Sequence, residues 1–163
     1  MATGLAKKLP TLIAAVALVQ PPFAESEPIW EWPQGREVAV REAFDPPAQR
    51  WLPGHRGVDL AGLDGDQLYA VDEGVVAFSG SIAGIGILSI EHDGGINSTY
   101  QPIDASVSKG DHVARGQPIG HLVEGKDHCA IGTCLHLGAK RGDTYLNPIF
   151  LLAGYEVALL PMG

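Results

Sequence analysis

Short runs of apolar and β-branched residues, separated by turns rich in glycine, fill most of this sequence after residue 36. This pattern is typical of short β-strands bounded by turn-forming residues. The chain has 21 glycines and 12 prolines among its 163 residues, so many positions favour a tight reversal. The runs that we predict to be strands are residues 38–40, 67–70, 74–79, 86–91, 96–100, 118–122 and 135–139.

Helical periodicity is nearly absent from the same region. No stretch of helical length repeats its apolar residues about every 3.6 positions, apart from the N-terminus and a turn near residues 148–153. A length of 163 residues is enough for one domain with a core and hardly enough for two. We therefore expect an all-β domain built from antiparallel strands.

The first 24 residues have the order of a secretory signal peptide. Lys7 and Lys8 precede an apolar run at residues 12–19, and the small residue Ala24 precedes a polar stretch. The alternative is an uncleaved membrane anchor, but the run is shorter than the roughly 20 residues that a spanning helix needs. We expect export, with cleavage near Ala24, to the periplasm or the exterior.

The remaining chain divides into a lead-in at residues 25–35 and a domain at residues 36–163. The lead-in contains Trp30 and Trp32, and we expect it to lie on the domain surface or to cover a sheet edge. The formal net charge of -8 argues against a nucleic-acid partner, because phosphate recognition needs a basic face.

Residues 107–120 contain glycines at a spacing that allows tight reversals between short strands. Hammerhead or hairpin turns of this kind also occur in lipoyl and biotinyl carrier domains, where a lysine at a hairpin tip takes the cofactor. The comparable earlier turn, residues 71–74, has no lysine. We therefore expect a shared hairpin geometry without a carrier role.

Two short segments contain side chains that bind metals. In the first, His55 and Asp59 can converge on one ion if the loop between them bends back. In the second, Cys134 and His136 are two residues apart on a predicted strand and therefore face the same side. Three protein ligands with one open position are usual for catalytic zinc. Spacing alone is weak evidence, since a single histidine is more often a surface or hydrogen-bonded residue.

Five motifs follow one another along the chain: HRGVD at 55–59, the run 69–76, the Thr99-Tyr100 pair, the glycine turns of 110–120 and LHLG at 135–138. Taken together and in this order, they resemble the lysostaphin-like metallopeptidases, the M23 group. The resemblance covers roughly residues 36–151. It implies an antiparallel β-sheet with an open groove, one zinc ion held by His55, Asp59 and His136, and cleavage of peptides in bacterial peptidoglycan. It also implies a location at the cell wall.

The sequence departs from the family at both catalytic positions that do not bind the metal. The family usually has histidines where this chain has Pro102 and Cys134. Proline has no side-chain donor or base, and loss of a general acid or base typically costs on the order of 10²–10⁴ in rate. We therefore expect a zinc metalloendopeptidase with weakened catalysis, acting on peptidoglycan stem peptides or cross-bridges.

Two other functions stay open. The first is a catalytically inactive homologue, stabilised by zinc, that binds cell-wall peptides or regulates a partner wall hydrolase. The second is an exported structural β-domain without a metal.

Several nearby residues have two interpretations. His128 could replace one missing histidine or be a surface loop residue, and the Tyr100 hydroxyl could assist near the groove or pack in the sheet. Cys129 and Cys134 are expected to form a disulfide in an oxidising compartment. As a free thiolate, Cys134 would instead be a fourth zinc ligand. His92 precedes a turn and is expected to be structural.

Overall fold

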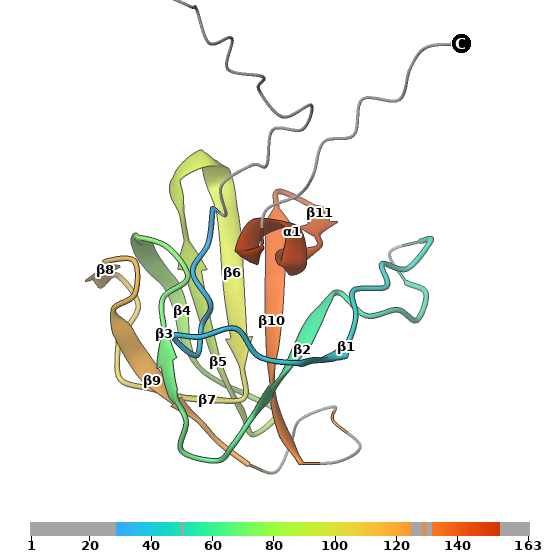
Figure 1. Ribbon diagram of the computed structural model, residues 1–163. Helices are drawn as coiled ribbons and strands as arrows, with labels where there is room; N and C mark the ends of the chain where they lie inside the picture. Colours follow the sequence, from blue (N-terminus) through green and yellow to red (C-terminus); the bar gives the residue numbers. More distant parts are fainter. Residues whose placement is uncertain (1–28, 50, 125–128, 130–131, 154–163) are drawn as a thin grey trace, which may run out of the picture.

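The computed structural model of the protein describes residues 29–49, 51–124, 129 and 132–153 (Figure 1). The predicted signal peptide and His128 lie outside these residues. The described chain forms two sheets in which every strand pairing is antiparallel. The all-β prediction is therefore confirmed.

The main sheet has the strand order β1-β2-β10-β6-β5-β4-β8, with β11 paired to β10, and the small sheet has the order β3-β9-β7. Neighbours in the main sheet come from distant parts of the chain, since β10 lies between β2 and β6 (Figure 1). The strands are β1 (Val40–Glu42), β2 (Gly57–Gly62), β3 (Gln67–Tyr69), β4 (Gly74–Ile82), β5 (Ile85–Glu91), β6 (Ile96–Gln101), β7 (Ile103–Ala105), β8 (His112–Val113), β9 (Pro118–Leu122), β10 (Thr133–Arg141) and β11 (Thr144–Leu146).

The two faces of the main sheet differ in burial. Along β6, Ile96, Ser98 and Tyr100 are buried, whereas the residues between them are half-buried. Strand residues alternate between faces, so one face lies in the core and the other stays accessible. Each fully buried aliphatic side chain stabilises the fold by about 1.5–3 kcal/mol. The core face joins one hydrophobic cluster with the small sheet, including Val58, Leu60, Leu68, Leu88, Ile90, Ile119, Leu122, Leu135 and Leu137.

The described part of the lead-in belongs to the domain. The Pro33 carbonyl accepts a hydrogen bond of 2.8 Å from the Tyr69 amide, so the segment covers an edge of the small sheet, as expected. Trp30, however, is only 2% exposed and joins the core rather than the surface. Its backbone amide donates to the Leu151 carbonyl at 2.8 Å, which ties the lead-in to the C-terminal helix.

Two short helical segments complete the described fold, the 3₁₀ turn η1 (Asp93–Gly95) and the helix α1 (Pro148–Leu152). Helix α1 begins where Asn147 accepts a hydrogen bond from the Ile149 amide at 3.1 Å, with proline in its first turn. Neither segment, nor any other described helix, has the length and apolar character needed to cross a membrane.

Strand β2 was not predicted, because the sequence suggested a loop that bends back between His55 and Asp59. Its sequence GVDLAG has glycine at both ends and an aspartate inside, which are weak strand formers. Its position between β1 and β10 supplies hydrogen bonds on both sides, and Gly57, Val58, Asp59 and Leu60 are buried. Tertiary pairing therefore overrides local preference here.

Candidate metal centre

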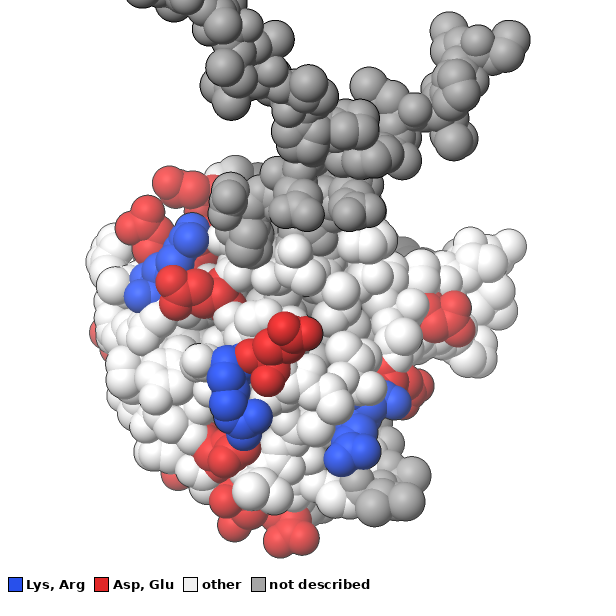
Figure 2. Space-filling view, viewed as in Figure 1, with Lys and Arg blue, Asp and Glu red and all other residues white. Residues whose placement is uncertain are grey.

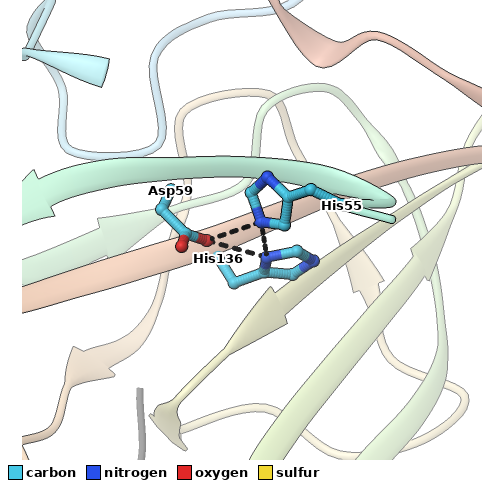
Figure 3. A group of neighbouring side chains, drawn as sticks. All are labelled: His55, Asp59 and His136. Carbon is cyan, nitrogen blue, oxygen red and sulfur yellow. Dashed lines mark hydrogen bonds and ion pairs between the residues drawn. The ribbon is translucent and has the colours of Figure 1, made fainter. Parts of the chain in front are cut away.

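His55, Asp59 and His136 meet on the accessible face of the main sheet (Figure 3). Asp59 of β2 and His136 of β10 are directly opposite each other in the strand register, so both side chains project to the same face. His55 precedes β2 and is held by two backbone hydrogen bonds with Asp45, of 2.7 and 2.9 Å. Two adjacent strands and one anchored loop residue thus bring the predicted ligands together.

The three side chains are closely spaced. Asp59 Oδ1 lies 2.8 Å from His136 Nδ1 and 3.1 Å from His55 Nε2, and the two ring nitrogens are 3.1 Å apart. Asp59 is fully buried, and the His55 and His136 side chains are 10% and 14% exposed. One oxygen and two nitrogens therefore face one point that is open to solvent only at its histidine side.

The orientation of His55 is set by its second ring nitrogen. Nδ1 lies 2.8 Å from the Ala43 carbonyl oxygen, which can only accept a hydrogen bond, so Nδ1 bears the proton. In neutral His55 the lone pair of Nε2 then points at Asp59 and His136. A backbone carbonyl in this position is a common way to fix a metal-binding histidine.

The centre has more acceptors than donors. In the neutral histidines, only the proton on His136 Nδ1 is available to Asp59 Oδ1 and His55 Nε2. Asp59 Oδ2 is buried and has no hydrogen-bond partner among the described residues. Burial by itself would raise the pKa of Asp59, but the hydrogen bonds and the electrostatic effect of the neighbouring His136 and His55 outweigh it and lower the pKa. The carboxylate is therefore ionised and short of donors.

A divalent cation fits this arrangement. Zinc bonds to nitrogen and oxygen are about 2.0–2.1 Å long, so two ligands of a tetrahedral ion lie roughly 3.3 Å apart. The observed separations of 2.8–3.1 Å are slightly shorter, so a small outward movement would accommodate an ion. Buried acceptors without donors are costly, and a cation removes that cost. A candidate metal site is thus present at the predicted ligands.

Gly57 explains one feature of the motif that contains His55. A Cβ atom at this position would overlap the Leu137 carbonyl oxygen and lie 2.7 Å from His136 Nε2. Any larger residue would therefore displace β10 or the His136 ring. Gly57 allows β2 to approach β10 closely enough for both ligands to share one centre.

The two departures from the family have distinct environments. Cys134 lies on the same face of β10 as His136 and forms a disulfide with Cys129, as expected. Pro102 is buried just after β6. The sequence analysis missed Gln101, which lies opposite His136 in the register and is half-buried on the metal-site face. The alternation of β6 was the signal that could have found it.

Tyr100 does not reach the metal centre. It is fully buried on the core face, where its hydroxyl accepts a hydrogen bond of 3.0 Å from the Val71 amide. Burial raises the pKa of Tyr100 to about 12. The packed interpretation of this tyrosine therefore describes the structure, and its hydroxyl is not placed to assist a reaction at the metal centre.

His92 has a structural environment, as the sequence analysis expected. Its Nδ1 lies 2.7 Å from the Glu73 carbonyl oxygen, and its Nε2 lies 2.7 Å from Ser98 Oγ. Ser98 Oγ is in turn 3.3 Å from the Tyr100 hydroxyl. His92, Ser98 and Tyr100, together with the Val71 amide, form what is here named the core network.

An antiparallel sheet that brings two histidines and an aspartate together on its accessible face can bind a divalent metal ion. The sequence model of Peptidase family M23 matches residues 53–148, which include all three side chains of the centre. The chain belongs to the M23 peptidase family. Peptidases of this family are zinc-dependent.

One protein sequence and two solved structures illustrate what the chain is similar to. The uncharacterized protein Rv2891 of Mycobacterium tuberculosis is 38% identical over 136 residues, which are 81% of this chain and 55% of that protein. A chain of the SpoIIQ–SpoIIIAH pore-forming complex has a TM-score of 0.66 at 20% identity, covering 78% of this chain and 92% of that one. Helicobacter pylori Csd3 has a TM-score of 0.62 at 25% identity, covering 81% of this chain and 37% of that one.

The similarities differ in how much of each protein they cover and in what they establish. This chain spans about half the length of the mycobacterial proteins that it matches. The SpoIIQ–SpoIIIAH similarity, at 20% identity, concerns the fold alone.

Proposed function

We propose that this chain is an exported zinc-binding M23-type metalloendopeptidase domain that acts slowly on peptides of peptidoglycan. The observation that carries the proposal is the convergence of Asp59 Oδ1, His55 Nε2 and His136 Nδ1, which share one proton when both histidines are neutral. Asp59 Oδ2 beside them has no partner among the described residues. When bound, zinc would polarise a peptide carbonyl and lower the pKa of a water molecule.

The residues beside the centre support binding of an extended peptide. In the register, Gly57, Gly138, Thr99 and Ser89 follow one another across β2, β10, β6 and β5 on the metal-site face. Gly57 lets β2 and the His136 ring lie close together, and Gly138, whose Cβ would meet only Thr99 at 3.6 Å, leaves room for a substrate backbone. The two hydroxyls can donate to the carbonyl groups of that backbone. Phe78 is opposite Ser89 and 37% exposed, which offers an apolar contact at the end of this row.

A cavity lined in part by Arg56, the residue that follows His55 in the sequence, adds a second contact region. It has a volume of about 290 Å³ and is lined by residues 46–49, Arg56 and the β10–β11 turn. The Arg56 guanidinium lies 5.7 Å from the centre of the Tyr145 ring, and Lys140 lies 5.5 Å from the same ring. Lys140 is paired with Asp143 at 3.6 Å, so Arg56 is the lining cation that can attract a carboxylate of a wall peptide.

Basic side chains do not form a continuous patch on the face of the molecule shown in Figure 2. On the face shown in Figure 2, Lys and Arg stand apart from one another, with Asp and Glu close by. This distribution is consistent with the net charge of -8.

A second function is favoured by the two departures from the family. Cys134 is held in a disulfide and Pro102 offers no donor or base, so neither can transfer a proton to a leaving amine. The alternative is therefore an inactive homologue, stabilised by zinc, that binds cell-wall peptides or regulates a partner wall hydrolase. Gln101 could still hold a substrate in either case, because it is opposite His136 in the register and on the metal-site face.

Release of soluble peptides from purified peptidoglycan distinguishes the two functions. For the peptidase, we expect slow release that is lost in Asp59→Asn. A triple variant with Pro102→His, Cys134→His and Cys129→Ser should be faster by about 10²–10⁴, since it regains the missing acid and base groups. The matched control is Cys129→Ser with Cys134→Ser, which lacks the disulfide but gains no histidine.

Absence of release by the zinc-loaded wild type and by the triple variant would contradict the peptidase. Sedimentation of the chain with intact walls, with the binding lost on addition of free stem peptides, would then support the inactive homologue.

A further inference from the structure

Asp59 belongs to a second cluster of metal-binding atoms. A carboxylate oxygen of Asp59 and the sulfur atoms of Cys129 and Cys134 all lie within 4.8 Å of one another. Asp59 and Cys134 are fully buried, and Cys129 is half-buried. In the disulfide these sulfur atoms are weak ligands, whereas as thiolates they are strong ligands for zinc and similar ions.

One oxygen of Asp59 is available to bind a second metal ion. Oδ1 takes both interactions with His55 and His136, as the dashed lines in Figure 3 show, while Oδ2 has no hydrogen-bond partner among the described residues. A carboxylate can bind through either oxygen or bridge two ions. One fully buried carboxylate is therefore within reach of two ligand groups of different chemistry.

We propose that reduction of the Cys129–Cys134 disulfide creates a thiolate metal site that shares Asp59 with the histidine centre. Its ligands are the two cysteine sulfurs and Asp59, and the ion that it takes is a borderline-soft divalent metal such as zinc or cadmium. Because Asp59 is common to both groups, reduction would also regulate the histidine centre that carries the proposed function. This regulatory part of the inference rests on the proposed function, whereas the thiolate site itself does not.

The chemistry balances with an external thiol as the reductant. Two thiols reduce the protein disulfide, are themselves oxidised to a disulfide, and leave Cys129 and Cys134 as thiols. A divalent ion then displaces one proton from each thiol and binds the two thiolates. Two negative charges would be costly in this enclosed position without the ion, so thiolate formation and metal binding occur together.

The geometry allows the change with small movements. Two sulfurs on one zinc ion are roughly 3.8 Å apart, for Zn–S bonds of about 2.3 Å. Across a disulfide they are about 2.05 Å apart. The Cα atoms of Cys129 and Cys134 are 6.0 Å apart, so side-chain rotation supplies the difference without unfolding β10.

The consequence is a difference between the oxidised and the reduced chain. With the disulfide formed, Asp59 serves the histidine centre alone. With the disulfide reduced, the thiolates draw the metal and Asp59 toward Cys134, and the histidine centre loses its carboxylate. Oxidation after export would therefore set the metal in the position required for peptide binding.

Cobalt(II) titration of the purified full chain tests this inference, because thiolate–cobalt bonds give an intense near-ultraviolet charge-transfer band. The oxidised chain should bind cobalt with weak visible bands and no charge-transfer band. After reduction by excess phosphine and its removal under anaerobic conditions, the charge-transfer band should appear at one equivalent. Asp59→Asn should weaken cobalt binding by the reduced chain at least about tenfold.

The controls separate a built site from a simple pair of thiols. Cys129→Ser with Cys134→Ser should show no charge-transfer band under either condition and should keep the oxidised-type spectrum. If the reduced wild type shows no such band while its circular dichroism stays native, the inference is overturned. An Asp59→Asn affinity equal to that of the reduced wild type also overturns it, because the thiols would then bind without the carboxylate.

This experiment distinguishes failure of the inference from failure of the proposed function. The proposed function requires cobalt or zinc binding by the oxidised chain through His55 and His136. Loss of oxidised binding in His136→Ala tests that centre without involving the sulfurs. The charge-transfer band tests only the thiolates.

Discussion

The metal centre and the core network contain similar side chains in opposite states of hydrogen bonding. In the core network, His92 has a partner at each ring nitrogen, and the Tyr100 hydroxyl has both Ser98 and the Val71 amide. In the metal centre, His55 Nε2, His136 Nδ1 and Asp59 Oδ1 face one another and share a single proton when both histidines are neutral, and Asp59 Oδ2 has no partner within the described part of the chain. Satisfied donors indicate a structural role, and converging acceptors indicate a cation.

The two regions lie on opposite faces of one sheet. Tyr100 and Ser98 project from β6 into the core, and Gln101 projects from the same strand beside His136. The alternation of a single strand therefore separates polar residues that stabilise the fold from those that can contact a metal or substrate. Substitutions in the two regions should have separable effects, on stability in one case and on metal binding in the other.

The largest expected effect is on metal affinity in Asp59→Asn. The amide lacks the charge of the carboxylate, and even outer partners of metal ligands contribute 10–100-fold to affinity. We expect zinc affinity to fall by more than about 100-fold in competition titrations with a chromophoric chelator. His92→Gln is the control in the core network and should retain wild-type affinity. Equal losses in both variants would remove the distinction between the regions.

Gly57→Ala should damage the metal centre through packing. Its Cβ would overlap the Leu137 carbonyl and crowd the His136 ring, so we expect a loss of about 1–3 kcal/mol in stability together with weaker zinc binding. Gly138→Ala is the matched control, because it is paired with Gly57 and its Cβ would meet Thr99 at 3.6 Å, an ordinary contact.

Gly138→Ala should stay within about 0.5 kcal/mol of wild type in urea unfolding. If both alanine variants behave alike, close approach at Gly57 is not what positions His136.

Tyr100→Phe should lower stability without changing metal binding. Removal of the hydroxyl leaves the buried Val71 amide without its partner, which costs about 1–3 kcal/mol. Urea unfolding measures the loss, and zinc content checks the metal centre. Tyr145→Phe is the control at a tyrosine that is 36% exposed, and its stability should barely change. Loss of zinc in Tyr100→Phe would contradict the separation of the two faces.

The smallest expected effect is a pH dependence from His92. Burial lowers the pKa of His92, although the Glu73 carbonyl and the Asp72 charge act in the opposite direction. The unfolded chain, with a histidine pKa near 6.5, therefore binds the proton more readily than the folded chain. The stability contributed by neutral His92 is complete above about pH 6.5 and declines as the pH falls below it, by up to about 1.4 kcal/mol per pH unit.

Urea unfolding of wild type and His92→Gln between pH 7.5 and 5 measures this dependence. The slope of stability against pH should be smaller in His92→Gln, and His121→Gln, at an exposed histidine, should keep the wild-type slope. An unchanged slope in His92→Gln would show that the buried imidazole does not titrate as described.

Short local patterns in the sequence predicted many of the strands, and the family resemblance implied His55, Asp59 and His136 as a group, which the structure brings together. Residues 118–122 were predicted as a strand and form β9 with the same bounds. Period-two alternation within β6 also indicates that Tyr100 is on the core face, since it shares that face with Ile96. The sequence analysis nevertheless kept two interpretations for Tyr100. By the same alternation Gln101 is on the opposite face, where it is paired with His136 in the register. The sequence analysis considered the neighbouring Pro102 and not Gln101.

Features that depend on distant partners could not be predicted in this way. Strand β2 has weak local preference and forms because β1 and β10 pair with it. The hydrogen bond between His92 and Ser98 depends on the hairpin between β5 and β6, and the Ala43 carbonyl that fixes His55 comes from a loop twelve residues away. The core position of Trp30 likewise requires the backbone contacts of the lead-in with Leu151.

Zinc content per mole of purified oxidised chain, measured by elemental mass spectrometry, tests the metal centre most directly. The account predicts about one zinc ion per chain, lost in His136→Ala and retained in His92→Gln. Zinc-replete preparations that contain no zinc would contradict it, and His55, Asp59 and His136 would then be a hydrogen-bonded cluster of a wall-binding or structural domain.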